Sequence, residues 1–456
     1  MITIFIFRRD LRLDDNIGLL YAINNFKNIV PIFIFTPEQI TDKNKYKSDN
    51  SIQFMLESLD DLNINLKKYN SKLHTFYGDN IEVLTKINKM YEIENIVYNI
   101  DYTPYAKKRD KQIKDFCLKN EINNYELEDY LLMKMGTLNK KDGSFYSVFT
   151  PFRNNAYKHY KEIDRPIKIK IKDKELIKLK NHKNYKIEIE KNENKLVIGG
   201  RKEGLKMLNL AIVKQKDYNK NHNNLSIETS LLSAYIKFGC VSIREVFWRI
   251  YDNYKLKNNL TSQLIWREFY YYIVYYNPDI LLKHKCFNPK YEDLNWSYDK
   301  NLFNKWKNGL TGFPIVDAGM RQMNETGYMH NRARLITSNF LNRMLNLDWR
   351  MGEQYFAQKL TDYDVVINNG NWQWIASCGT DTKPFNQRTF NPWLQSNKYD
   401  KNCEYIKKWI PELKDVPSNK IHKWYKYCDE YKNVYIKPIV DYNEAKKLSI
   451  KIFEMK

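Results

Sequence analysis

Four short apolar runs near the start of the chain alternate with helical patterns. The runs are rich in β-branched and aromatic side chains and cover residues 2–7, 29–35, 73–77 and 96–100. Each run is short enough for a buried strand. The segment from residue 104 to 120 begins with proline, which favours a helix start there. Strands that alternate with helices predict an α/β N-terminal domain built on a doubly wound parallel sheet.

The second half of the chain has a different character. Residues 160–200 are charged and poor in aromatic residues, which is typical of a surface linker with short extended pieces. A helical pattern then continues to the end, and all ten tryptophans lie at or after Trp248. A chain of 456 residues is too long for one compact core. We therefore predict an α/β domain over 1–135, a linker over 136–200 and an all-α domain over 201–456.

The charge balance points to a polyanionic partner. The formal net charge is +21, and nucleic acid is the first candidate for the partner of so basic a chain. The alternative is lysine usage spread evenly over a solvated surface, and any single lysine run fits that alternative well.

The six cysteines are scattered without a CxxC pair, and no HxxxH pair appears among the seven histidines. This favours a reduced, intracellular protein, cytoplasmic or nuclear, and indicates no metal site. No apolar run reaches about 18 residues, and the first residues lack a secretory pattern. We therefore expect neither a transmembrane helix nor a secretory signal.

Two segments of the second half carry polar side chains at helical spacing. In SQLIWREFYYY the residues Gln263, Trp266 and Arg267 share one helix face with Tyr270. In the segment that follows His330, three more residues share a face: Asn331, Arg334 and Leu335. An aromatic stripe at this spacing is more often core than ligand site, but Arg and Gln are harder to bury without a partner.

Ser230 and Ser233, in ETSLLSAYIKFG, are predicted to begin another helix, and Thr229 or Ser230 is a good candidate N-cap for it. Hydroxyl groups at a helix N-terminus also suit a phosphate. Capping alone explains these residues equally well.

Residues 362–381, DYDVVINNGNWQWIASCGTD, pack acids, amides and indoles among apolar residues. Buried charges are costly unless they are paired or hydrogen-bonded. The stretch therefore suggests a polar ligand in a mostly apolar site. The alternative is a capped helix followed by a glycine turn.

Together the motifs resemble the photolyase/cryptochrome flavoprotein family. The resemblance covers essentially the whole chain, and its strings are FRRDLRLDDN, FTPFR, TSLLSAYIKFGCVS, QLIWREFYY, TGFPIVDAGMRQMNETGYMHNRARLITSNFL, DWRMGEQYF, NNGNWQWIASCGTD followed by TFNP, and IKPIVDYNEAK. The likeness is greatest to photolyases that split cyclobutane pyrimidine dimers, of the class I type or a short-linker relative of it. It implies an N-terminal antenna domain, a helical FAD domain and damaged DNA as partner, and we expect a monomer that does not bind a membrane.

The resemblance also implies a set of FAD-binding residues. The pyrophosphate would lie beside Tyr218 and against the segment Thr229, Ser230, Leu231, Leu232 and Ser233. Arg334 and Asp362 would form an ion pair next to the isoalloxazine. The rest of the implied cofactor set is Gln263, Arg267, Asn331, Asp364 and Asn368, with Asn368 facing flavin N5 and Asn331 between flavin and substrate. An amide facing N5 is typical of photolyases, which use reduced FAD.

Further roles follow from the same resemblance. Trp372, Trp349 and Trp296 match the family's tryptophan chain, which photoreduces the flavin. The DNA-contact set is Trp266, Arg332, Leu335 and Trp374, around a dimer flipped out of the duplex.

Three positions depart from the patterns of these photolyases, and one of them is Leu335, which replaces a Met common in dimer photolyases. Gln263 stands where those enzymes usually carry Glu, and Gln is typical of (6-4) photolyases and animal cryptochromes. The histidines of (6-4) enzymes are replaced by Asn331 and Leu335, with His330 one residue off. Family members that bind folate as a second, light-harvesting chromophore carry a glutamate where this chain has Ala106. The resemblance therefore does not identify a second chromophore for this chain. The alternative functions are a cryptochrome-type blue-light receptor, a (6-4) photolyase, or a flavin- or nucleotide-binding protein without photochemistry.

Overall fold

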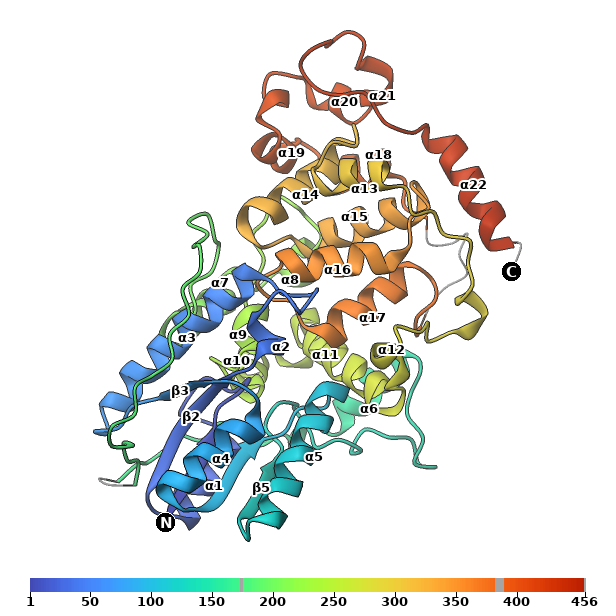
Figure 1. Cartoon of the computed structure of the whole chain (residues 1–456). Coiled ribbons are helices and arrows are strands. Elements are labelled where there is room, and N and C mark those ends of the chain that lie inside the picture. The colour runs from blue at the N-terminus through green and yellow to red at the C-terminus, as the bar shows by residue number, and fades with distance from the viewer. Residues whose placement is uncertain (173–174, 382–388, 455–456) are drawn as a thin grey trace. The chain divides into compact units, whose positions relative to one another are not determined.

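The computed structural model describes residues 1–172, 175–381 and 389–454 (Figure 1). By its contacts, the chain forms two compact units. Unit 1 comprises residues 1–191, 197–216 and 230–278, and unit 2 comprises residues 192–196, 217–229 and 279–456. These units are defined by their internal contacts, whereas the predicted limits at 135 and 200 come from the pattern and composition of the sequence, so those limits stay a prediction. No helix among the described residues is long and apolar enough to cross a membrane.

Unit 1 contains a five-stranded parallel sheet in the order β3-β2-β1-β4-β5. Its strands are β1 Ile2–Ile6, β2 Ile29–Phe35, β3 His74–Tyr77, β4 Ile93–Asn99 and β5 Asn123–Leu127. The four apolar runs are therefore confirmed as strands, and the sheet is parallel as predicted. Strand β5 was not predicted, because NNYEL is polar and lies at the edge of the sheet, where it is only partly buried.

The helices α1 Ile17–Asn25, α3 Asp49–Lys67, α4 Asn80–Tyr91 and α5 Pro104–Lys119 connect the strands. Helix α5 begins at Pro104, as predicted, and the Thr103 side chain caps it by accepting from the Ala106 N–H. One core cluster joins side chains of α4 and α5 to those of β1, β2 and β4, so these two helices cover one face of the sheet.

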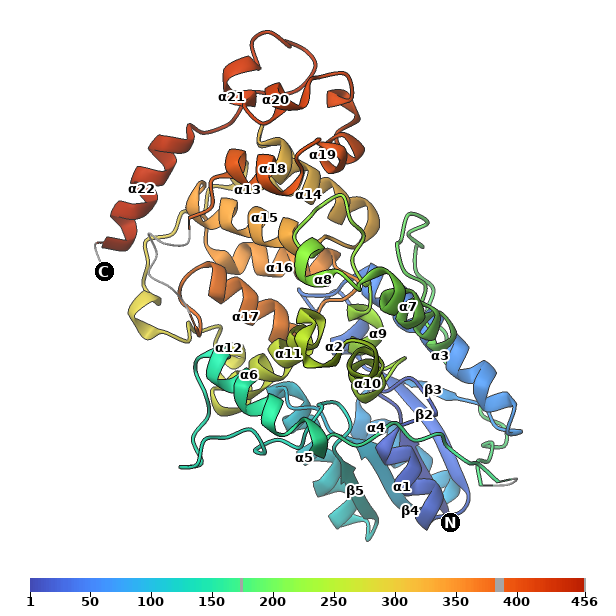
Figure 2. The same ribbon diagram turned by 180° about the vertical axis from the view of Figure 1, so that it is seen from behind.

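Six further α-helices belong to the described part of unit 1: α2 Pro37–Ile40, α6 Phe149–Lys158, α7 Arg201–Lys214, α9 Ser233–Lys237, α10 Ile243–Tyr254 and α11 Asn259–Tyr276. Helix α10 packs against α7 and α11, and α6 packs against α11 (Figure 2). The predicted linker also contacts this unit, because Leu176 forms a parallel bridge with Ile29 and the Tyr185 N–H donates to the Thr75 carbonyl. Short extended pieces in that segment are thus confirmed.

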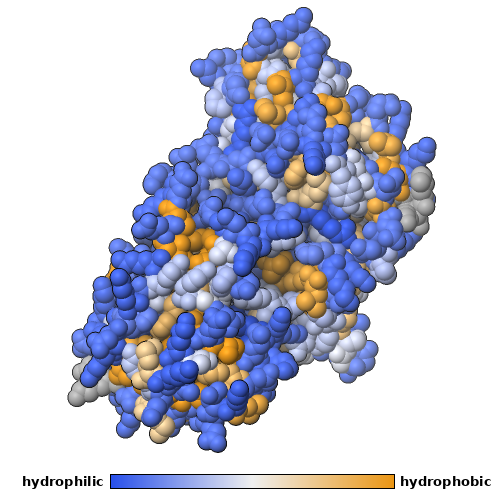
Figure 3. All heavy atoms as spheres, viewed as in Figure 1, coloured by the Kyte–Doolittle hydropathy of each residue, from blue (hydrophilic) through white to orange (hydrophobic). Residues whose placement is uncertain are grey.

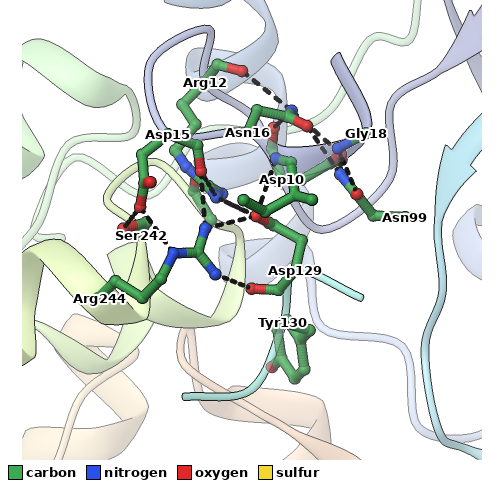
Figure 4. A network of polar contacts seen from close by, with 12 residues as sticks. Asp10, Arg12, Asp15, Asn16, Gly18, Asn99, Asp129, Tyr130, Ser242 and Arg244 are labelled. Atoms are coloured by element: carbon green, nitrogen blue, oxygen red, sulfur yellow. Dashed lines mark hydrogen bonds and ion pairs between the residues drawn. The ribbon is translucent and has the colours of Figure 1, made fainter. Parts of the chain in front are cut away.

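A buried ion network ties the segment after β1 to α10 (Figure 4). Asp129 accepts from the Arg12 guanidinium at 2.7 Å and from the Arg244 guanidinium at 2.7 Å. Arg244 also reaches Asp15 at 3.0 Å, and all four side chains are at most 5% exposed. Buried charges persist only when they are paired and hydrogen-bonded. Much of the FRRDLRLDDN motif therefore holds unit 1 together.

Among the described residues, the regular elements of unit 2 are helices, apart from one isolated bridge between Ser297 and Leu347. Its longer helices are α13 Lys300–Lys307, α14 Pro314–Thr326, α15 Asn331–Arg343, α16 Trp349–Lys359, α17 Val365–Ile375, α18 Pro392–Tyr399 and α22 Tyr442–Glu454. Shorter ones are α8 Tyr218–Asn221, α12 Asp279–Leu282, α19 Glu404–Trp409, α20 Ser418–Ile421 and α21 Trp424–Tyr427. They enclose one core that is rich in tryptophan. The predicted all-α second half is confirmed.

The molecular surface is mostly hydrophilic on the face drawn in Figure 3, with small apolar patches. Lysine and arginine together make up 75 of the 456 residues, against 54 acidic residues. Such a surface attracts polyanions through long-range electrostatics.

Candidate active site

Helix α17 begins with a buried carboxylate. Asp364 is the N-cap, and its Oδ1 accepts from the Val366 N–H at 3.0 Å and the Ile367 N–H at 3.1 Å. An N-cap of this kind satisfies helix donors that would otherwise lack partners. The capped-helix reading of the 362–381 stretch is therefore correct for Asp364.

Asn368 lies one turn further along α17. Its Nδ2 donates to the Glu353 carbonyl of α16 at 3.0 Å. This bond fixes the orientation of the amide and leaves Oδ1 as an acceptor. The side chain is half-buried, so a ligand can reach it.

Arg334 and Asp362 form an ion pair. The Arg334 Nη2 lies 2.9 Å from Asp362 Oδ2 and 3.1 Å from Oδ1, and Nε donates to the Met329 carbonyl at 2.9 Å. The Asp362 side chain is 5% exposed and the Arg334 side chain 26%. Arg334 is thus held between Asp362 and the Met329 carbonyl. Its role beside a flavin stays a prediction.

The predicted DNA contact Arg332 has partners within unit 2. Its Nε donates to Asn223 Oδ1 at 2.9 Å, Nη2 donates to the same oxygen, and the guanidinium carbon lies 4.5 Å from the Tyr399 ring centroid. Burial lowers the pKa of Arg332.

Through Asn223, Arg332 holds the segment 217–229, which carries Tyr218 and Thr229. Burial raises the pKa of Tyr218 to about 12.

His330 is the N-cap of α15. Its Nδ1 accepts from the Arg332 N–H at 3.0 Å. Burial, followed by the charges of Arg332 and Arg334, lowers the pKa of His330 to about 4. The imidazole is therefore neutral near pH 7. Two other predicted site residues lie on α15: Asn331 is exposed, and Leu335 is half-buried.

The three tryptophans of the predicted chain lie in one apolar core. Trp372 is 2% exposed, Trp349 is 0% and Trp296 is 6%. The Trp372 ring packs edge-on against Phe356, with centroids 4.9 Å apart. Trp374 is half-buried on the same helix.

Unit 1 supplies the other predicted residues. Helix α11 confirms the predicted helix, with Gln263 exposed and Trp266 half-buried. The Trp266 ring stacks on Phe149 of α6, with centroids 3.6 Å apart and an interplanar angle of 8°. Arg267 is buried, and it pairs with Glu268 at 3.0 Å and donates to the Tyr130 carbonyl at 2.9 Å.

The predicted N-cap at Thr229 or Ser230 is wrong. Helix α9 begins at Ser233, and its N-cap is Leu232, which makes no side-chain cap bond. The reason lies in Leu231, whose φ of +52° turns the chain just before the helix. This places two residues between the hydroxyl of Ser230 and the first helical residue.

The structure thus gathers the implied cofactor residues in two groups. Unit 2 brings together the starts of α15 and α17 with the Arg334–Asp362 pair and Asn368, since α15, α16 and α17 pack on one another. This donor set fits a large polar ligand such as a flavin: it offers a fixed ion pair, an oriented amide and an exposed amide at Asn331. Unit 1 carries the remaining cofactor residues, which are Ser230, Leu231, Leu232, Ser233, Gln263 and Arg267.

Sequence reasoning passed over three residues that shape this region. Phe149 supports Trp266, and its only signal was its place in the FTPFR string. A β-carbon on Gly352 would lie 2.2 Å from Trp372, so only glycine leaves room for that ring. Trp306, in the charged string NKWKNG, is fully buried and contacts Trp372, and no local pattern marks it.

Two family profiles match the chain. Residues 3–169 match the profile described as DNA photolyase, and residues 260–455 match the FAD binding domain of DNA photolyase. A relative from Buchnera aphidicola subsp. Acyrthosiphon pisum, named deoxyribodipyrimidine photo-lyase, is 34% identical over 98% of this chain and 96% of its own length. The Escherichia coli protein of the same name is 31% identical over 98% and 97%.

Solved structures agree with these relatives. A photolyase from Sulfolobus tokodaii, described with two FAD molecules, is 37% identical with a TM-score of 0.87 over the full length of both chains. A class III photolyase from Agrobacterium tumefaciens is 28% identical with a TM-score of 0.89, over 100% of this chain and 97% of its own.

Proposed function

This chain belongs to the DNA photolyase family, and we propose that it splits cyclobutane pyrimidine dimers in DNA in a light-driven reaction. The observation that carries the proposal is the Arg334–Asp362 pair together with the oriented Asn368 amide on the packed helices α15 and α17, in a chain that aligns with photo-lyases along nearly all of its length. We further propose that it is of the class I type.

We propose FAD as the cofactor. When bound in reduced form, FAD supplies the electron that opens the cyclobutane ring after excitation by light, and it takes that electron back. In unit 2, Arg334, Asp362, Asp364 and Asn368 would hold the flavin and its ribityl chain, with Tyr218 and Thr229 on the segment toward the pyrophosphate. Unit 1 would contribute Ser230, Leu231, Leu232 and Ser233, with Gln263 and Arg267.

The protein's own residues supply positioning and hydrogen bonds. Gln263 and Asn331 would hydrogen-bond the flipped pyrimidines, and Trp266 and Trp374 would pack on their faces. Phe149 fixes the plane of the Trp266 ring. Arg332 would contact DNA near Leu335 through Nη1, while Nε and Nη2 remain on Asn223. Trp372, Trp349 and Trp296 would deliver electrons that keep the cofactor reduced.

The (6-4) alternative has weaker support. His330 uses Nδ1 to cap α15 and stays neutral, so it is poorly suited to protonate a substrate at pH 7. Asn331 and Leu335 replace the histidines of that enzyme class. A cryptochrome-type receptor role stays the second alternative.

A light-harvesting group in unit 1 is a further part of the proposal. The Sulfolobus tokodaii relative is described with two FAD molecules and a novel light-harvesting cofactor. A second flavin is therefore the first candidate here. Folate is disfavoured, because Ala106 is buried in α5 and offers no polar side chain.

The test uses purified, chemically reduced protein and two DNA substrates, one with a cyclobutane dimer and one with a (6-4) photoproduct. We expect loss of the cyclobutane dimer under blue light and no loss in the dark. Repair of neither lesion would refute the enzyme proposal, and repair of the (6-4) product alone would refute the substrate.

A further inference from the structure

The ring of Trp372 meets a second tryptophan that the family resemblance does not assign. Its centroid lies 6.3 Å from that of Trp306 in α13, at an interplanar angle of 74°. Trp306 is fully buried, and its Nε1–H donates to the Thr337 carbonyl at 3.0 Å. Two indoles in contact inside an apolar core are close enough to exchange an electron.

From Trp306, ring contacts continue to a tyrosine. The centroids of Trp306 and Tyr355 are 6.0 Å apart at 61°. Tyr355 is half-buried, and its hydroxyl donates to Asn324 Oδ1 at 2.6 Å. Trp372, Trp306 and Tyr355 thus form a continuous run of oxidisable side chains from the core of unit 2 toward solvent.

The charges around these rings favour Tyr355 as the end of the run. Trp306 cannot release its indole proton, because Nε1 faces a carbonyl in a dry interior. The ammonium groups of Lys307 and Lys359 lie 5.5 Å and 5.8 Å from the Tyr355 centroid and disfavour positive charge on the phenol. An oxidised Tyr355 must therefore lose its phenol proton, and its partial exposure lets water accept that proton.

We propose that Trp306 and Tyr355 form a second electron path into Trp372, in addition to the path through Trp349 and Trp296. The inference rests on the proposed photochemistry. Trp372 gives one electron to the photoexcited oxidised cofactor, Trp306 refills Trp372, and Tyr355 refills Trp306. Tyr355 releases one proton to water and remains as a neutral tyrosyl radical. A thiol reductant in solution then returns one electron, with a proton, to that radical.

The test compares holoprotein variants by flash absorption and by electron paramagnetic resonance, with ring-deuterated tyrosine to identify the radical. In Trp349→Phe, which blocks the first path, we expect a tyrosyl radical and a remaining rate of cofactor photoreduction. Adding Tyr355→Phe to that background should remove the radical and lower the rate at least tenfold, and adding Trp306→Phe should do the same. The control is Tyr405→Phe, which removes a buried hydroxyl of unit 2 that bonds to Gln322, and it should keep both signals.

Cofactor absorbance and thermal unfolding confirm that each variant is folded and loaded. If Trp349→Phe alone abolishes both photoreduction and the tyrosyl radical in folded, loaded protein, the second path is refuted. Chemically reduced native protein needs no photoreduction before it can repair a dimer. A repair assay with that protein therefore tests the proposed function separately from the second electron path. Repair without a tyrosyl radical overturns only the second path.

Discussion

The Trp372 ring occupies the space that a β-carbon on Gly352 would need. The distance from that position to Trp372 Cη2 is 2.2 Å, and the next ring atom is 2.6 Å away. Gly352 lies inside α16, where glycine costs helix stability and therefore needs a reason. The reason is the close approach of α16 to α17 at the indole.

The first prediction follows from this fit. Gly352→Ala should push the Trp372 ring from its place, destabilise the protein by about 1–3 kcal/mol as overpacking does, and slow cofactor photoreduction. Urea unfolding and flash photoreduction measure the two effects. Met351→Ala, one position away on the same helix, is the control for the substitution itself. A Gly352→Ala protein with native stability and native photoreduction would contradict the fit.

The second prediction concerns the Arg334–Asp362 pair. Asp362→Asn removes the charge that balances Arg334, and the guanidinium is partly exposed, so a loss of roughly 1–3 kcal/mol in unfolding free energy is expected. FAD content per protein, measured by absorbance, should fall as well. Glu412→Gln breaks the exposed pair with Arg321 and should change neither quantity. Full FAD content in Asp362→Asn would argue against a cofactor role for the pair.

The third prediction concerns Asp129. Burial favours its neutral form, but the adjacent Arg12 and Arg244 outweigh burial and lower its pKa, so Asp129 is charged. Asp129→Asn leaves two buried guanidinium groups with too little negative charge, which costs about 3–5 kcal/mol. Chemical denaturation measures the loss. Asp252→Asn, at the exposed pair with Arg165, is the control and should cost little.

The fourth prediction is a pH dependence. The pKa of His330 falls from its ordinary 6.5 to about 4 on folding, mainly through burial. Its contribution to stability is therefore complete above pH 6.5 and is lost as the pH falls from 6.5 to about 4. The linked free energy is about 3 kcal/mol.

His330→Asn keeps a side-chain oxygen to cap α15 but cannot titrate. Its unfolding free energy should therefore fall less than that of the native protein between pH 6.5 and 4. His159→Asn in unit 1, which leaves the cap of α15 in place, is the control for replacing a histidine by asparagine. Identical curves for the native protein and His330→Asn would refute the assignment.

The fifth prediction tests the departure at Gln263. Gln263→Glu restores the residue usual in class I dimer photolyases, so the rate of dimer repair by reduced protein should hold or rise. Gln263→Leu, of similar size without hydrogen-bonding atoms, should lower it. A large drop in Gln263→Glu would show that the amide is required and that the substrate differs.

Local patterns in the sequence were enough for much of the fold. Apolar runs predicted β1, β2 and β4 because a strand buried on both faces is mostly apolar, and the run 73–77 predicted β3 although that strand lies at the other edge of the sheet. Strand β5 escaped notice because NNYEL, at the sheet edge, needs no such composition. The N-cap near Ser230 was misplaced because a leucine with positive φ turns the chain, and leucine carries no signal for that conformation.

The site depended on a different kind of information. Arg334 and Asp362 are 28 residues apart, and only the family resemblance, not spacing, paired them. The fit of Gly352 to Trp372 and the contact of Trp306 with Trp372 arise from helix packing. Such contacts leave no periodic trace in the chain, so they required coordinates.

The network around Asp129 has a consequence for synthesis on the ribosome. The last strand of the sheet ends at Leu127, yet Arg244 is 115 residues beyond Asp129 in the chain. Until Arg244 leaves the ribosome, Asp15 and Asp129 of the nascent chain lack one of their two arginine partners. They must then stay in contact with water or be only partly neutralised. We therefore expect residues 1–135 alone to fold incompletely, and the sheet to close its interior only after α10 has been translated.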